Sequence, residues 1–124
     1  MTIALWCILA ACFLPIVCSW LAKGGGKQFD NASPRAWLEQ QTGWRLRADW
    51  AQRNHYEVFP AFAAAVLVAH VTHAPQVWAD ALAVVFLLLR LAYIAAYIAG
   101  RASLRSALWT AGFVCILGLF AISA

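Results

Sequence analysis

The sequence predicts an all-α integral membrane protein, folded as one domain with a bundle of four transmembrane helices. Of its 124 residues, 65% are hydrophobic and 11% are charged, whereas roughly 25% of the residues of a soluble domain are charged. A helix needs about 20 apolar residues to cross the ~30 Å hydrocarbon core of a bilayer. Four segments approach this length: 3–22, 46–73, 76–99 and 106–123.

The first segment, 3–22, has the length of a membrane span and also that of a secretory signal peptide. A signal peptide opens with a positive charge and ends at a small-residue cleavage site, and Met1-Thr2-Ile3 carries no charged side chain. We therefore expect a permanent helix. Pro15 leaves one carbonyl in it without an intrahelical donor, which a neighbouring helix or a hydroxyl such as that of Ser19 can satisfy. Lys23 and the glycine-rich stretch 24–27 are expected to stop the span.

The connection 23–45 is expected to be a long cytoplasmic loop. The stretch Asp30-Asn31-Ala32-Ser33-Pro34-Arg35 has the pattern of a capped helix start, so a short interfacial helix is expected there. The glycines at 24–26 lack the spacing of a phosphate-binding loop, which excludes a nucleotide site of that kind.

The second segment, 46–73, carries Arg53, Asn54 and Glu57 ahead of its apolar part. An ionisable side chain inside a membrane helix costs roughly 2.5–3.5 kcal/mol, so it indicates a functional site with a partner. Arg53 and Glu57 are four residues apart and share one helix face. Pro60 is expected to bend the helix just beyond Glu57.

The third segment, 76–99, contains a second deep charge, Arg90, which follows the apolar run 81–89. Glu57 and Arg90 each lie about ten residues from the cytoplasmic ends of their helices, or roughly 15 Å deep. We expect them to pair, because an isolated buried charge costs more than a hydrogen-bonded pair. The pair could serve as a packing clamp alone. However, Tyr93, Tyr97 and Arg101 lie on the same stripe as Arg90 and favour a polar cavity.

The net charge of +4 indicates membrane topology. Lys and Arg gather in the first connection and around 101–105, whereas the connection 72–80 has neither. By the positive-inside rule the first and third connections are expected to be cytoplasmic and both termini to lie on the other side of the membrane. The basic balance therefore gives no indication of nucleic-acid binding.

No metal site is predicted. The cysteines lack the paired spacing of zinc or redox sites and are expected to be small buried side chains: Cys7, Cys12, Cys18 and Cys115. His70 and His73 are expected near the non-cytoplasmic end of the second segment, with too few further ligands for a metal.

Two motifs resemble the MAPEG family, the membrane-associated proteins in eicosanoid and glutathione metabolism. They are Arg53-Asn54-x-x-Glu57-x-x-Pro60, and Arg90-x-x-Tyr93-x-x-x-Tyr97 followed by Leu104-Arg105-Ser106. The first connection, with Asp30-Asn31 and Pro34-Arg35-Ala36-Trp37-Leu38, resembles the bacterial branch. The resemblance implies a homotrimer of four-helix protomers in the bacterial inner membrane, in contact with lipid, with glutathione bound at subunit interfaces.

The resemblance also implies roles for individual residues. Arg105, at the start of the fourth helix, would stabilise the thiolate of glutathione, and Ser106 would supply a neighbouring hydroxyl. Guanidiniums suit the carboxylates of glutathione, and Glu57 suits its ammonium. The predicted glutathione contacts are Arg47, Arg53, Asn54, Glu57, Arg90, Tyr93, Tyr97 and Arg101.

One position departs from the family pattern. Trp50 stands where eukaryotic members usually carry a further arginine, and Arg45 or Arg47 is the nearest substitute. The predicted function is a glutathione-dependent transferase or peroxidase that acts on lipophilic electrophiles from the bilayer. The alternative is a non-catalytic membrane binding or scaffold protein with weak or no glutathione binding. A small drug transporter is disfavoured because the first helix contains no acid.

Overall fold

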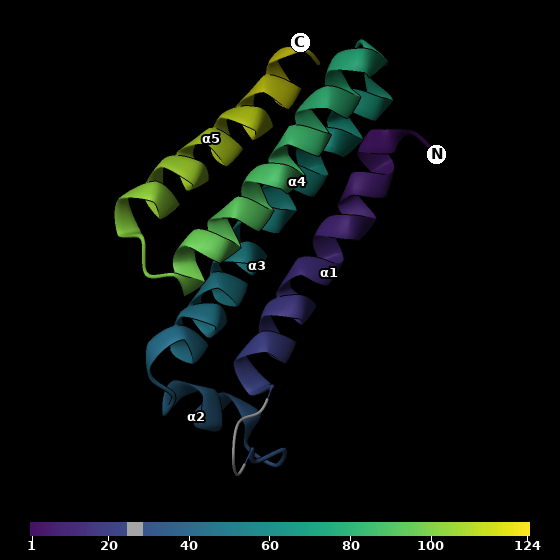
Figure 1. Cartoon of the computed structure of the whole chain (residues 1–124). Helices are drawn as coiled ribbons and strands as arrows, with labels where there is room; N and C mark the ends of the chain where they lie inside the picture. Colours follow the sequence, from purple (N-terminus) through teal and green to yellow (C-terminus); the bar gives the residue numbers. More distant parts are fainter. Residues whose placement is uncertain (25–28) are drawn as a thin grey trace.

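The computed structural model describes residues 1–24 and 29–124, and this part of the chain is helical without strands. Four long helices run side by side: α1 (Ile3–Lys23), α3 (Gly43–Val71), α4 (Gln76–Ile98) and α5 (Ala102–Ala121) (Figure 1). A short helix, α2 (Pro34–Glu39), follows Ser33, where the sequence predicts an interfacial helix. The expected stop of the first span extends into residues 25–27, which lie outside the described residues.

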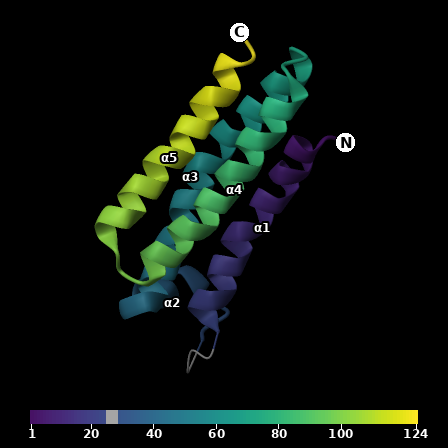
Figure 2. The same cartoon turned by 45° about the horizontal axis from the view of Figure 1, so that its top comes forward.

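Both termini lie at one end of the bundle, and α2 and the α4–α5 connection lie at the other (Figures 1 and 2). We call this second end the α2 end. The helices alternate in direction, α1 packs mainly on α3, and α4 packs mainly on α5. Most described cations belong to segments at the α2 end: Lys23, Arg35, Arg45, Arg47, Arg101 and Arg105.

Three helices, α1, α4 and α5, are long and apolar enough to span a membrane. The chain is therefore a multi-pass membrane protein. The helix α3 is the longest, but it does not meet the same standard of hydropathy because polar and charged side chains occupy its first half. A fourth span through α3 stays a prediction.

The helix α5 begins at Ala102, four residues before the predicted start at 106. Gly100, with φ +74°, ends α4. The Gly100 and Arg101 amides donate to the carbonyls of Tyr97 and Ala96 (3.0 and 2.9 Å), the pattern of a Schellman motif. The new helix then starts at once. The amide of Arg105 is bonded to the carbonyl of Arg101 (2.9 Å), so Arg105 lies inside α5 and has no free backbone donor.

The core of the bundle is aromatic at its centre and alanine-rich around it. Phe62 on α3 and Phe86 on α4 are fully buried and stacked, with ring centroids 3.9 Å apart. A Cβ added at Gly118 would lie 3.3 Å from Leu82, which shows how closely α5 approaches α4. Close helix contacts through small residues are typical of membrane bundles.

One cysteine departs from the expected burial, since Cys12 is exposed while the other three are buried.

Candidate functional site

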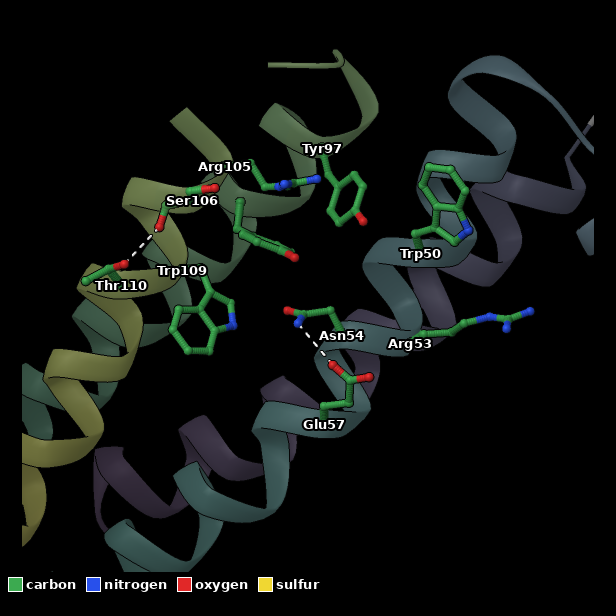
Figure 3. A pocket seen from close by; sticks show the side chains of 10 residues that line it. Trp50, Arg53, Asn54, Glu57, Tyr97, Arg105, Ser106, Trp109 and Thr110 are labelled. Atoms are coloured by element: carbon green, nitrogen blue, oxygen red, sulfur yellow. Dashed lines mark hydrogen bonds between the residues drawn. The ribbon is translucent and has the colours of Figure 1, made fainter. Parts of the chain in front are cut away.

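A cavity of 480 Å³ lies between α3, α4 and α5 in the half of the bundle near the α2 end. Seven of the ten predicted site residues line it: Arg53, Asn54, Glu57, Tyr93, Tyr97, Arg105 and Ser106. The other three lining residues are Trp50, the position that departs from the expected pattern, and Trp109 and Thr110, which the sequence did not predict. Figure 3 shows the side chains that line the cavity, with Asn54 and Glu57 on one side and Arg105, Ser106 and Trp109 on the other.

The α4 and α5 side of the cavity presents a cation against aromatic rings. The guanidinium of Arg105 lies over the ring of Tyr97, 4.7 Å from its centroid. Tyr97 in turn meets Tyr93 edge to face, with centroids 5.5 Å apart. The neighbouring Ser106 accepts through its carbonyl from the Thr110 hydroxyl (3.0 Å) (Figure 3). Stacking on Tyr97 holds the Arg105 charge at the cavity wall.

The α3 side presents a carboxylate. Asn54 donates its Nδ2–H to Oε2 of Glu57 over 3.2 Å (Figure 3). Glu57 is exposed, and the ion pairs within residues 1–24 and 29–124 do not include it. A carboxylate with one neutral hydrogen bond still has acceptor sites for a cationic ligand group.

Arg53 lines the cavity, but its guanidinium extends away from Asn54 and Tyr97 (Figure 3). Its Nε–H donates to Asp49 (2.9 Å) and its Nη2–H to Glu39 on α2 (3.3 Å). The side chain of Asp49 is buried, and that of Arg53 is half-exposed. Through these two contacts Arg53 joins α3 to α2. A ligand in the cavity would have to compete with two carboxylates for the Arg53 guanidinium.

The predicted pair of Glu57 and Arg90 is wrong. Arg90 is buried behind the cavity and does not line it. It donates its Nε–H to Nδ1 of His55 (3.3 Å) and its Nη2–H to Oδ1 of Asn54 (3.1 Å), and it lies 4.1 Å from the centroid of Tyr93. The two charges are linked only through the Asn54 amide, because Glu57 faces the cavity while Arg90 lies in the bundle interior.

His55, which the sequence analysis missed, is fully buried between the helices. Its Nε2 lies 2.9 Å from the carbonyl oxygen of Ala11. This is the carbonyl that lacks an intrahelical donor because of Pro15, four residues later. The proline therefore was the available signal, since it left one carbonyl of α1 in need of a donor.

Two further predicted contacts, Arg47 and Arg101, do not line the main cavity. With Arg105 they border a smaller one of 170 Å³ beside it. Arg47 donates to the carbonyl of Ile98 (3.0 Å), and Arg45 donates to the carbonyls of Ala22 and Gly24 (3.1 and 2.8 Å). Neither places a guanidinium in the main cavity at Trp50, so the expected substitution for the missing arginine is not seen.

The fold and the cavity together define a helical integral membrane protein with a polar pocket near one end of its bundle. The model of the MAPEG family matches residues 3–124, essentially the whole chain. The chain therefore belongs to the MAPEG family. This family generally uses glutathione as a substrate, and its proteins are generally trimers. No curated protein matches the chain.

Proposed function

We propose that the protein is a membrane-embedded, glutathione-dependent transferase or peroxidase that acts on lipophilic electrophiles. The observation that carries this proposal is the presence of opposite charges at two walls of one cavity, with Arg105 on α5 and Glu57 on α3. Glutathione carries a thiol, two carboxylates and an ammonium. An arginine at one wall suits the thiolate of such a molecule, and a carboxylate outside the ion pairs of the described residues, at the other wall, suits its ammonium.

In this proposal Arg105 favours ionisation of the glutathione thiol. A nearby guanidinium stabilises a thiolate over a thiol, which lowers the pKa of the sulfur. In the transferase reaction the thiolate sulfur attacks the electrophilic carbon and forms a C–S bond. The leaving group departs with its electron pair. In an addition to a carbon–carbon double bond, the π electron pair moves instead to the neighbouring carbon, which is then protonated. Ser106, one residue on, would place a hydroxyl beside the sulfur.

The apolar part of the cavity wall supports a substrate that arrives from the bilayer. Trp109 lines the cavity and stacks on Phe113, with centroids 5.4 Å apart. Both side chains are 37% exposed in the protomer. A lipophilic molecule could therefore reach the cavity along α5 without crossing water.

We also propose a homotrimer in the inner membrane of a bacterium, with both termini periplasmic. The cations near the α2 end support a cytoplasmic position for that end. Arg53 and Glu57 are exposed on a protomer although they belong to a helix of the bundle. Charged groups facing lipid are costly, so a neighbouring copy against this side of α3 would stabilise them.

One observation favours the alternative function, a membrane binding protein with weak or no glutathione binding. Trp50 stands at the cavity wall, and Arg45 and Arg47 are engaged with backbone carbonyls elsewhere. The carboxylates of glutathione then have fewer cations than the family pattern provides.

Thermal unfolding of the full-length protein in detergent, with and without glutathione, separates these functions. Saturation at about 100 times Kd stabilises a protein by roughly 2.7 kcal/mol. We expect a clear rise in Tm with glutathione and formation of a thioether with a lipophilic electrophile. A rise in Tm without any turnover of electrophiles or peroxides would support the binding protein. The absence of both effects would contradict the proposal.

A further inference from the structure

We propose that His55 is a positioning residue of the cavity, which acts through Arg90 to fix the Asn54 amide and so directs a donor to Glu57. This inference deepens the proposed function, because it assigns recognition of the ligand's ammonium to Glu57. It concerns four side chains that lie in one hydrogen-bonded chain from α1 to the cavity.

The chain begins at the carbonyl of Ala11, which can only accept. Its partner at 2.9 Å, Nε2 of His55, must therefore carry the proton. In a neutral imidazole the other nitrogen is then an acceptor. Nδ1 of His55 faces the Nε–H of Arg90 at 3.3 Å, a group that can only donate. The tautomer of His55 thus follows from its two partners.

The same argument applies to the contact between Arg90 and Asn54. Its Nη2–H can only donate, so the atom of Asn54 at 3.1 Å is the amide oxygen. The Asn54 nitrogen is then on the other side, where it donates to Glu57. A flipped amide would place its NH₂ against a guanidinium and its oxygen against a carboxylate, which removes both bonds and adds repulsion.

The consequence concerns the free acceptor sites of Glu57. A donor on Oε2 holds the carboxylate in one orientation and leaves Oε1 for a ligand cation. Without an acceptor at residue 55, Arg90 loses one of its two anchoring bonds, and Asn54 is no longer held in a single orientation. We therefore expect loss of His55 to weaken recognition of an ammonium group more than recognition of the rest of the ligand.

The test compares two substitutions that separate hydrogen bonding from packing. His55→Phe keeps a ring beside Phe59, whose centroid is 6.3 Å from that of His55, but removes both nitrogens. His55→Gln supplies one donor and one acceptor on a side chain of similar reach. The probes are glutathione and its des-amino analogue, which has the same thiol and carboxylates but no ammonium. Calorimetric titration of the full-length protein in detergent gives each Kd.

We expect the wild-type protein and His55→Gln to prefer glutathione over the analogue by about 10-fold, the scale of one hydrogen bond to a charged group. His55→Phe should bind both within about 2-fold. An unchanged 10-fold preference in His55→Phe overturns the inference. If His55→Phe does not fold, His55→Met, which fills the site without a ring nitrogen, takes its place with the same expectations.

A second readout does not need a ligand and separates failure of this inference from failure of the proposed function. If the wild-type protein binds neither probe, the proposed function fails. The positioning role of His55 is then tested by NMR, from the chemical shifts of the Asn54 side-chain amide. These resonances are assigned by their loss in Asn54→Asp. Displaced resonances in His55→Phe, with wild-type positions in His55→Gln, support the inference. Wild-type positions in both variants overturn it.

Discussion

Nε2 of His55 on α3 donates to the carbonyl oxygen of Ala11 on α1 over 2.9 Å. Pro15 has no amide hydrogen to give this oxygen, so a side chain from another helix supplies the bond. The carbonyl that Pro15 leaves without an intrahelical donor thereby forms a specific contact between α1 and α3. The same imidazole accepts from Arg90, which connects the packing of α1 to the cavity between α3, α4 and α5.

This relationship predicts a coupling between Pro15 and His55. Pro15→Ala returns an intrahelical donor to the Ala11 carbonyl, so the His55 bond should contribute less in that background. His55→Phe should therefore cost about 1 kcal/mol less in Pro15→Ala than in the wild-type protein. Reversible unfolding in mixed micelles measures the four free energies of this double-mutant cycle. Equal costs in both backgrounds would show that the bond to Ala11 does not stabilise the fold.

The second prediction concerns Arg90 and Glu57. Arg90→Leu leaves acceptors on His55 and Asn54 without a donor, so it should destabilise the protein by about 2–4 kcal/mol. Because Glu57 is no direct partner, adding Glu57→Gln should recover less than about 0.5 kcal/mol. The same unfolding assay measures both variants. Substantial recovery in the double variant would indicate the direct ion pair that the structure lacks.

The third prediction restores a cation at the cavity wall. Trp50→Arg places a guanidinium beside Tyr97, whose ring centroid is 6.4 Å from that of Trp50. It should lower the Kd for glutathione by about 10-fold, the scale of one charge-assisted hydrogen bond. Trp44→Arg is a matched control, because Trp44 is 43% exposed and Trp50 is 44% exposed, and Trp44 lies outside the cavity. Equal effects of both substitutions would indicate general electrostatic attraction.

The fourth prediction is the homotrimer. Native mass spectrometry from several mild detergents should show a complex of three protomers, since a neighbouring copy would cover the exposed charges of α3. Arg53→Glu reverses an exposed charge on the side of α3 that the neighbouring copy would cover, and a carboxylate buried there without a partner should reduce the trimer fraction. Arg35→Glu on α2 makes the same charge change as a control. Only monomers in all mild detergents would contradict the prediction.

The sequence indicated how far along its helix each charged group lies, but not its direction around the helix. Helical rise places Glu57 and Arg90 at equal depth, but the rotation of α3 about its axis decides which side chain faces Arg90. His55 is two residues before Glu57, or roughly 200° around the helix. It points into the bundle while Glu57 points into the cavity. A single sequence contains no direct record of that rotation.

The cavity was partly predictable for a related reason. The motif residues on α3, α4 and α5 share the half of the bundle near the α2 end, and their spacing indicated a common polar pocket. The partners of Arg53 were not predictable, because Glu39 belongs to α2 and its position depends on how the first connection folds back. The start of α5 was misplaced because charges at 101 and 105 resembled a loop, whereas the turn takes only residues 99–101, with Gly100 at positive φ.

The proposed function depends on stabilisation of a thiolate by Arg105, which ultraviolet absorbance of the bound thiolate can measure. Wild-type protein saturated with glutathione at neutral pH should show a thiolate band that is absent from either component alone. Arg105→Leu should remove the band, as a result of a higher pKa of the bound thiol, and lower the conjugation rate by about 100-fold. Arg35→Leu removes an exposed arginine on α2 and should retain both. Equal thiolate fractions in wild-type protein and Arg105→Leu, each with glutathione bound, would contradict the account.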